Sequence, residues 1–293
     1  MTSLLVRATA TIARALPQGA RNFLYRLGPV SDAIRSMLTR AAPAEIVPAE
    51  IAAGPLARMQ MHLDLRSEKD LWLGTYEPAL LDAIKTFVGP GQTVYDVGAN
   101  IGYMSLALAK AVGEDGRVVA FEPLPANIAR LEANFALNAV GTRVEVVSAA
   151  VGELTSQEQF LVHQSGAMGK LQGSTGRQTE YERSLTVEVI ALDDWTADSN
   201  YEPPALIKID VEGGEAAVFR GMSSILARDH PTILLELHGL EASEEVQMIL
   251  AGAGYRLHEM RQGYPAVTEI AHWKSHVVAL PKDAKRELRS NEM

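Results

Sequence analysis

The chain has 293 residues, of which 47% are hydrophobic and 22% charged, and these fractions are typical of a soluble globular protein. It contains no cysteine, which excludes disulfides, thiolate metal sites and cysteine nucleophiles. No apolar run approaches the roughly 18 residues that a membrane-spanning helix needs, and the first residues lack the features of a secretory signal. We therefore expect a cytoplasmic protein.

The first 43 residues are basic, whereas the whole chain is acidic. They hold six arginines against one aspartate, although the net charge of the chain is −9. Apolar residues at helical spacing predict helices over Ser3–Leu16, Ala20–Leu27 and Ser31–Leu38. Three prolines then predict a linker over Ala41–Pro55.

Three roles are open for this basic segment. It could be a helical lid on the core, a targeting segment, or a helix that contacts an anionic membrane surface through residues 1–40. The acidic remainder argues against a nucleic-acid partner, and the sequence does not indicate an oligomeric state. We expect an N-terminal extension at 1–70, one large domain at 71–281 and a polar tail at 282–293.

From residue 78 onward, β-rich runs alternate with helical periods, which is typical of a doubly wound α/β fold with a mainly parallel sheet. Helices are expected over Ile101–Val112 and Ala126–Leu137. Two additional strands, Glu158–His163 and Leu185–Ala191, flank a segment rich in Gly, Ser and Gln at Gln164–Gln178, which we expect to be a mobile substrate loop. The predicted strands of the main sheet are Thr93–Asp96, Arg117–Phe121, Val144–Ala149, Ala205–Asp210, Thr232–Glu236, Tyr255–Met260 and His276–Ala279.

The first of these strands leads into a glycine loop, Asp96-Val97-Gly98-Ala99-Asn100-Ile101-Gly102, which opens a helix. Such glycines let a ligand approach the backbone closely. The spacing differs from that of dinucleotide-binding loops, because Gly98 and Gly102 are four residues apart and Asn100 lies between them. Asp96 adds a carboxylate that suits a cationic cofactor and would repel a pyrophosphate. The loop therefore favours S-adenosylmethionine over NAD.

A second carboxylate follows the next strand, in Phe121-Glu122-Pro123. It lies about 20 residues beyond the glycine loop, which is the spacing of a ribose ligand. We therefore expect Glu122 to bind the ribose hydroxyls of the cofactor. Glu77, Ser148 and Ala149 are further candidate cofactor contacts.

Taken in order, several blocks of the chain resemble the FkbM-type S-adenosylmethionine-dependent methyltransferases, over roughly residues 75–281. The resemblance implies a seven-stranded class I methyltransferase fold whose last strand is antiparallel to the rest. It also implies O-methylation of a small-molecule or glycan acceptor, at a hydroxyl of a sugar or a secondary metabolite. The blocks are Tyr76-Glu77-Pro78, Asp96 to Gly102, Phe121-Glu122-Pro123, Leu192-Asp193-Asp194, Ile207 to Gly213, Gly221 and Glu236-Leu237-His238.

The candidate catalytic residues follow the fourth and fifth strands, where ligands bind in open α/β sheets. Methyl transfer to a hydroxyl needs alignment and a base. We expect His238 to be the base and Asp210 to position the cationic methyl donor, with Glu212 beside them; Asp210 is the alternative base. Glu236 lies inside an apolar strand and must be paired, and we expect Lys208 to be its partner.

Other interpretations of these residues stay open. Asp210, Glu236 and His238 could bind a divalent cation that activates the acceptor hydroxyl, although this is not our primary prediction. An NAD-dependent oxidoreductase would share the glycine loop and the ribose carboxylate, and the loop spacing counts against it. A non-catalytic cofactor-binding scaffold that acts through its basic segment is the third alternative.

Overall fold

The computed structural model describes residues 42–163, 168–174, 181–198, 202–267, 270 and 274–282, together with 36, 39 and 40. The three helices expected before residue 39 therefore lie almost entirely outside the described residues, as does the polar tail after residue 282. The chain divides into two compact units. The first comprises residues 1–78 and 133–139, and thus extends beyond residue 70, and the second comprises residues 79–132 and 140–293.

The described part of the first unit contains a two-stranded antiparallel sheet and a short helix. Strand β1 (Val47–Glu50) pairs with β2 (Gln60–Leu63), and α4 spans Lys69–Leu73. The linker expected at Ala41–Pro55 is therefore wrong. Proline is tolerated in a strand of this kind, and the apolar residues directly after β1 are buried instead of exposed.

Two asparagines near the end of α7 (Pro125–Leu137) explain why residues 133–139 belong to the first unit. Asn134 Oδ1 accepts a hydrogen bond from the backbone N of His62 at 2.7 Å. Asn138 bonds both the backbone N and the carbonyl O of Gln60, at 2.9 and 2.7 Å. These amides therefore satisfy backbone groups of β2, much as a neighbouring strand would.

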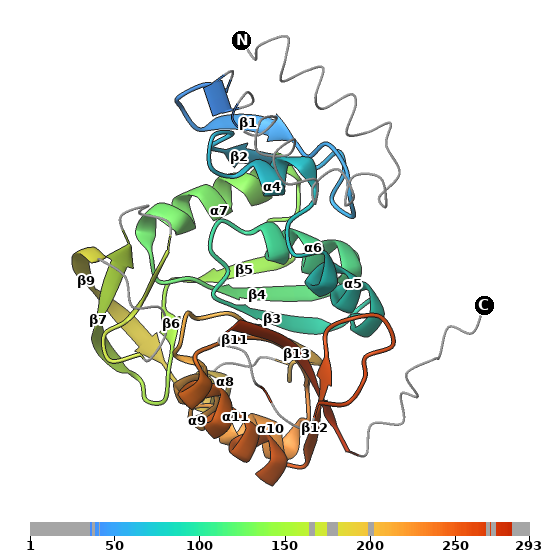
Figure 1. Cartoon of the computed structure of the whole chain (residues 1–293), viewed down its shortest axis with the longest axis vertical. Helices are drawn as coiled ribbons and strands as arrows, with labels where there is room; N and C mark the ends of the chain where they lie inside the picture. Colours follow the sequence, from blue (N-terminus) through green and yellow to red (C-terminus); the bar gives the residue numbers. More distant parts are fainter. Residues whose placement is uncertain are drawn as a thin grey trace. The chain divides into compact units, whose positions relative to one another are not determined.

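The second unit is built on a seven-stranded sheet of order β12-β13-β11-β10-β3-β4-β5 (Figure 1). Six strands form as predicted with small shifts at their ends, and the predicted strand Val144–Ala149 stops at Val147. Strand β13 is antiparallel to both of its neighbours, which confirms the expected topology. The strands are β3 (Thr93–Val97), β4 (Arg117–Phe121), β5 (Val144–Val147), β10 (Leu206–Ile209), β11 (Thr232–His238), β12 (Tyr255–Glu259) and β13 (Lys274–Pro281).

The order of the strands reverses between β3 and β10. From β3 the chain proceeds outward to β4 and β5, and it then returns to β10 on the other side of β3. Because β-α-β crossovers are right-handed, the helices of the two halves cover opposite faces of the sheet. The chain therefore leaves the ends of β3 and β10 in opposite directions. Open α/β sheets bind ligands between two such strand ends.

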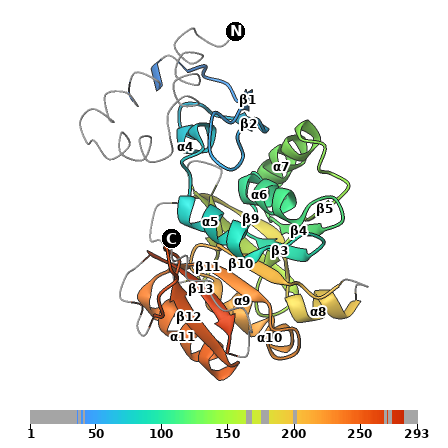
Figure 2. The same ribbon diagram turned by 90° about the vertical axis from the view of Figure 1, so that its right-hand side faces the viewer.

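The two faces of the sheet differ in polarity near the strand ends. Alternate residues of β3, β10 and β11 point into one buried apolar cluster, together with residues of α9 (Glu215–Arg220), α10 (Ser223–Arg228) and α11 (Leu240–Gly252). Figure 2 shows these helices beside β11, β12 and β13. Since neighbouring residues of a strand face opposite sides, Asp96, Lys208, Glu236 and His238 belong to the other face. The remaining helices of this unit are α5 (Pro78–Phe87), α6 (Tyr103–Val112) and α8 (Leu192–Asp198).

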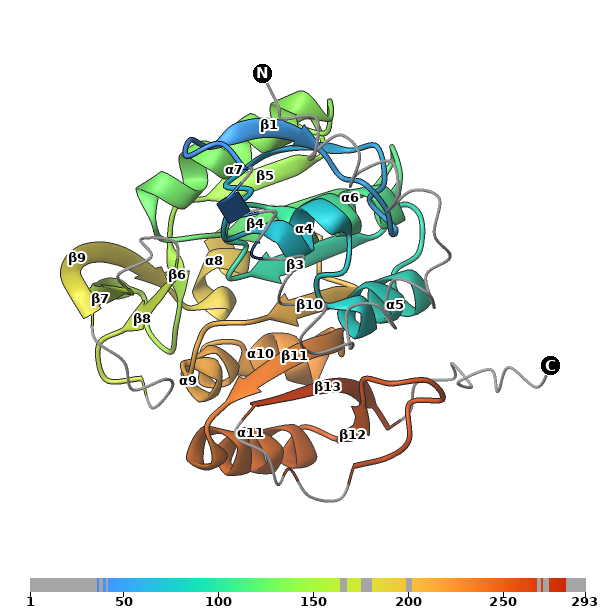
Figure 3. The same ribbon diagram turned by 45° about the horizontal axis from the view of Figure 1, so that its top comes forward.

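The chain between β5 and α8 forms a separate sheet of order β6-β9-β7-β8 (Figure 3). Both strands predicted there are present and are longer than expected. The described part of Gln164–Gln178 contains a strand, β8, which pairs with β7, and the rest of that segment lies outside the described residues. The strands are β6 (Ala150–Val151), β7 (Ser156–His163), β8 (Gly169–Leu171) and β9 (Tyr181–Ile190).

Two aspartates of α8 connect this inserted sheet to the helices that follow it. Asp193 accepts hydrogen bonds from the backbone N of Ser224 and Ile225, at 2.8 and 3.1 Å, and so satisfies free amides at the start of α10. Asp194 accepts a bond from the hydroxyl of Thr155 at 2.7 Å. These contacts tie α8 both to the inserted sheet and to α10.

Among the residues described above, no helix is both long and apolar enough to cross a membrane.

Candidate active site

The glycine loop after β3 has the backbone that its sequence indicates. Gly98, Asn100 and Gly102 all have positive φ, at 78°, 51° and 87°. A Cβ at Gly98 would lie 1.9 Å from the carbonyl oxygen of Asp210, so no other residue fits there without moving the chain. The loop after β3 therefore packs directly against the end of β10.

A buried ion pair lies beneath this loop. The Nζ of Lys208 is 3.0 Å from Asp96 Oδ1, and it donates a hydrogen bond to the carbonyl of Gly98 at 2.9 Å. The hydroxyl of Ser105 donates to the other oxygen of Asp96 at 2.6 Å. Burial opposes the charge of Lys208, but the carboxylates of Asp96 and Asp210 outweigh burial and raise the pKa of Lys208. Asp96 thus holds the loop in place, and its contact with a cofactor stays a prediction.

This pairing corrects the expectation that Lys208 binds Glu236. The register of the sheet places Lys208 directly beside Asp96 on β3, and beside Leu234 on β11. Glu236 is two residues further along β11. Lys208 and Asp96 each lie one residue before the end of their strand, but this equivalence emerges only from the observed strand bounds and register.

Glu122 lies against the glycine loop as predicted for a ribose ligand. Its Oε2 accepts a hydrogen bond from the backbone N of Asn100 at 2.8 Å. Its Oε1 accepts bonds from the backbone N of Leu124 and the amide of Asn127, at 3.0 and 3.1 Å. Burial raises the pKa of Glu122 despite these bonds. The carboxylate is therefore held rigidly at the start of the loop.

The other candidate cofactor contacts have different surroundings. Ser148 is exposed and Ala149 is buried, and both follow β5 at the same end of the sheet as Glu122. The backbone N of Glu122 donates to the carbonyl of Val147, which places these residues next to each other. Glu77 belongs to the first unit and has a positive φ of 43°. The roles of Glu77, Ser148 and Ala149 stay predictions.

The three candidate catalytic residues, Asp210, Glu212 and His238, lie together with Glu236 at the ends of β10 and β11. One ligand atom each of Asp210, Glu236 and His238 lies within 4.8 Å of the other two. Glu212 Oε2 is 3.8 Å from His238 Nε2. The strand ends therefore form the cluster that the sequence predicts.

His238 is buried between carboxylates on both sides of its ring. Nδ1 is 2.9 Å from Glu215 Oε1, and Nε2 is 2.8 Å from Glu236 Oε1. Burial opposes a charge on the imidazole, but the hydrogen bonds to Glu215 and Glu236 outweigh it and raise the pKa of His238 to about 10. At neutral pH the ring carries its proton and has no lone pair to accept another. This geometry does not favour the role of base that we expected for His238.

Asp210 has the properties that a base requires. Its side chain is 26% exposed, and its Oδ2 is 4.0 Å from Lys208 Nζ. Burial raises the pKa of Asp210 to about 6, with Lys208 opposing the shift and Glu236 adding to it. The carboxylate is therefore mostly ionised at neutral pH, yet it is basic enough to take a proton.

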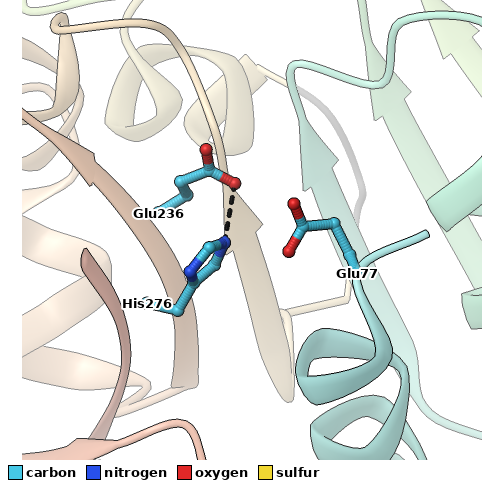
Figure 4. A group of neighbouring side chains, drawn as sticks. All are labelled: Glu77, Glu236 and His276. Atoms are coloured by element: carbon cyan, nitrogen blue, oxygen red, sulfur yellow. Dashed lines mark hydrogen bonds and ion pairs between the residues drawn. The ribbon is translucent and has the colours of Figure 1, made fainter. Parts of the chain in front are cut away.

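Glu236 is paired across the sheet with the antiparallel strand β13. Register places it opposite His276, whose Nε2 is 3.0 Å from Glu236 Oε2 (Figure 4). Lys274 forms a second ion pair with Glu236. Burial alone would raise the pKa of Glu236, but the bonds from His238, His276 and Lys274 lower it far below its usual range. Glu236 is thus a permanent anion that neutralises the surrounding cations.

The sequence did not indicate three members of this cluster. An acid such as Glu215 in the first turn of a helix is explained by the helix dipole alone, and Lys274 and His276 depend on the register of an antiparallel strand, which sequence does not reveal.

The divalent-cation hypothesis for Asp210, Glu236 and His238 stays an alternative. A metal binds the neutral imidazole, so it would have to displace the proton that the carboxylates of Glu215 and Glu236 favour on His238.

The chain is similar to known methyltransferases. The methyltransferase FkbM domain matches residues 96–257, which is more than half of the chain. The hexuronic acid methyltransferase AglP of Haloferax volcanii is 28% identical over 194 residues, covering 65% of this chain and 70% of that protein. The 31-O-demethyl-FK506 methyltransferase FkbM of Streptomyces tacrolimicus is 30% identical over 209 residues, covering 62% of this chain and 79% of that protein.

Among solved structures, a methyltransferase FkbM from Methylobacillus flagellatus aligns with a TM-score of 0.41 and 17% identity, covering 73% of this chain and 53% of that one. The extent of the domain match, on a chain with this glycine loop and this strand order, decides the family. The chain belongs to the FkbM family and is an S-adenosylmethionine-dependent methyltransferase.

Proposed function

We propose that the protein transfers the methyl group of S-adenosylmethionine to a hydroxyl of a sugar or secondary-metabolite acceptor, with Asp210 as the base. The observation that carries this proposal is the placement of Asp210. Its partly exposed carboxylate follows β10, beside the glycine loop, and has a pKa raised to about 6. This combination distinguishes it from Asp96 and Glu236, which are buried and paired at 3.0 Å or less.

The residues of the loop fit the cofactor. The backbone approaches closely at Gly98, where there is no room for a side chain, and a carboxylate lies where a ribose ligand is needed. S-adenosylmethionine, when bound, supplies a methyl group on a cationic sulfur, which suits a site with several carboxylates. The residues proposed to hold it are Glu77, Asp96, Gly98, Asn100, Gly102, Glu122, Ser148, Ala149 and Asp210.

Proton removal is assigned to Asp210. The acceptor oxygen would bond to the methyl carbon while the bond from that carbon to sulfur breaks and S-adenosylhomocysteine leaves, and the hydroxyl proton would move to the carboxylate of Asp210. Lys208, 4.0 Å away, keeps this carboxylate ionised before the transfer. Glu212, close to the imidazolium of His238, completes the polar wall on the side of β11. His238 stays charged throughout and balances the carboxylates.

The inserted sheet is the proposed wall of the acceptor site. A Cβ at Gly214 would lie 3.5 Å from the hydroxyl of Ser174, which follows β8. The β7–β8 hairpin thus borders the turn that follows Asp210. The two curated relatives act on a hexuronic acid and on a demethylated FK506, which supports a hydroxyl-bearing small molecule or glycan as the acceptor.

Transfer of a labelled methyl group from S-adenosylmethionine to a panel of acceptors tests the proposal. The panel should contain uronic acids, neutral sugars and polyketide alcohols. Asp210→Asn is expected to lower kcat by roughly 10²- to 10⁴-fold, because it removes the proton acceptor. Its affinity for S-adenosylhomocysteine, whose sulfur is neutral, should change little.

Asp194→Asn is the matched control, since Asp194 lies in α8 and accepts a hydrogen bond from the surface hydroxyl of Thr155. It should methylate like the wild type. A fully active Asp210→Asn variant would contradict the assignment of the base. Binding of the cofactor without methylation of any acceptor would favour the scaffold alternative.

A further inference from the structure

We propose that Glu215 is a positioning residue, which holds His238 as a fixed cation and ties it to the turn between Asp210 and α9. Glu215 lies outside the sequence blocks that carry the family resemblance and outside the expected site. The effect of Glu215 on the pH dependence of kcat rests on the proposed function above, whereas its effect on the charge of His238 does not.

One oxygen of Glu215 makes both of the contacts that matter. Oε1 accepts a hydrogen bond from the backbone N of Gly213 at 3.1 Å and lies 2.9 Å from Nδ1 of His238. The side chain is fully buried, as is that of His238. A buried carboxylate between an amide and an imidazolium is a charge-assisted link. Through it, the turn that carries Glu212 is connected to the end of β11.

The charged groups around His238 come from every neighbouring element. Glu215 faces Nδ1 from α9, while Glu236 of β11 and Glu212 of the turn face Nε2 at 2.8 and 3.8 Å. Asp210 completes the anionic shell, and Lys208 of β10 lies 4.0 Å from Asp210. Lys274 and His276 of β13 bind the far side of Glu236.

Glu215 has a distinct place in this shell. Glu236 shares its charge with Lys274 and His276, and Asp210 shares its charge with Lys208. Among the described residues, Glu215 contacts the amide of Gly213 and the ring of His238, so its negative charge acts mainly on the imidazole. Without that charge, the balance between burial and the remaining carboxylates shifts towards the neutral ring.

The state of His238 also affects the base. The imidazolium lowers the pKa of Asp210, against the larger effect of burial. If His238 loses its proton, the pKa of Asp210 must rise, and less of the carboxylate is ionised at neutral pH. Glu215 therefore acts on the reaction through two intermediate groups and does not touch the reactants.

Nuclear magnetic resonance of the ring of His238 in the cofactor-free protein tests the first step. Glu215→Gln keeps a carbonyl oxygen for the amide of Gly213 but removes the charge. The titration midpoint of His238 should fall by at least about one pH unit, which is the usual effect of an opposite charge at this distance. The His238 signal is assigned by its absence in His238→Gln.

Glu245→Gln is the matched control, because Glu245 lies on α11 and forms an exposed ion pair with Arg220 of α9. It should leave the His238 titration unchanged. Glu215→Asp, which keeps the charge, should retain a midpoint clearly above the ordinary value of about 6.5. An unchanged midpoint in Glu215→Gln overturns the proposal. If that variant does not fold, an ordinary midpoint in Glu215→Asp overturns it instead.

The pH dependence of kcat tests the second step. The charge of His238 acts on the acidic limb only where the ring titrates near that limb. If the midpoint of His238 in Glu215→Gln falls to about 7 or below, the acidic limb should move to higher pH; if the midpoint stays above about 8, the ring keeps its proton there and the limb should stay in place. In both cases KM for S-adenosylmethionine should stay within about twofold. A midpoint of about 7 or below with an unmoved acidic limb would overturn the link to Asp210. If the wild-type protein methylates none of the acceptors, the proposed function fails while the His238 titration still decides the role of Glu215.

Discussion

Replacement of Lys208 by methionine removes the cation beneath the cofactor loop and leaves a chain of similar length. Asp96 is fully buried, and in the variant it keeps its bond from Ser105 but loses the ion pair at 3.0 Å. The carbonyl of Gly98 also loses its donor at 2.9 Å. Breaking one partner of a buried ion pair costs about 3–5 kcal/mol, since it strands the other charge. We expect a loss of that size in the free energy of unfolding.

Urea unfolding followed by circular dichroism measures this loss, and a second substitution isolates its cause. Asp96→Asn with Lys208→Met removes both charges and keeps the bond from Ser105. If the stranded carboxylate is responsible, the double variant should be more stable than Lys208→Met by about 2 kcal/mol or more. Arg117→Met is the control, because the ion pair of Arg117 with Glu145 is exposed and should contribute only about 0–1 kcal/mol.

The reasoning is refuted if Lys208→Met costs no more than Arg117→Met. It is also refuted if the double variant is no more stable than Lys208→Met, since the cost would then come from lost packing and not from the unpaired charge.

Three further outcomes follow from the site. Glu122→Gln should weaken S-adenosylhomocysteine binding by about tenfold in calorimetry, or 1.4 kcal/mol, and unchanged affinity would contradict its role as ribose ligand. The kcat of the wild type should fall as pH falls through about 6, because protonation of Asp210 removes the base, and a flat profile would contradict this. Gly98→Ala should be far more destabilising in thermal unfolding than Gly113→Ala, because both have positive φ but only Gly98 faces a carbonyl at 1.9 Å; equal losses would contradict the close packing.

Much of the fold could be predicted because the signals are local. The period of apolar residues located the strands of the main sheet, and the glycine loop marked the turn from β3 into α6. The linker error at Ala41–Pro55 has a local cause too. A cluster of prolines predicts an interruption of regular secondary structure. Pro48 instead lies in β1, and the apolar residues after it are buried by contacts distant in sequence.

For the site, the sequence could predict which residues lie together at the strand ends, but not which of them pair. The carboxyl ends of parallel strands meet at one edge of the sheet, so the grouping of Asp210, Glu236 and His238 followed from topology alone. The pairings did not follow, because they depend on register. Lys208 could pair with either neighbouring strand, and only the alignment of β10 with β3 assigns it to Asp96.

Register also explains why we assign the base to Asp210. Asp96 has Lys208 at 3.0 Å, and Glu236 has His238 at 2.8 Å and His276 at 3.0 Å. Asp210 has its nearest paired cation, Lys208, at 4.0 Å, and that ammonium is already shared with Asp96. Since the interaction of two buried charges weakens with distance and with sharing, burial dominates at Asp210 and raises its pKa to about 6. The ion pairs of Asp96 and Glu236 thus occupy the nearby cations and leave Asp210 able to exchange a proton near neutral pH.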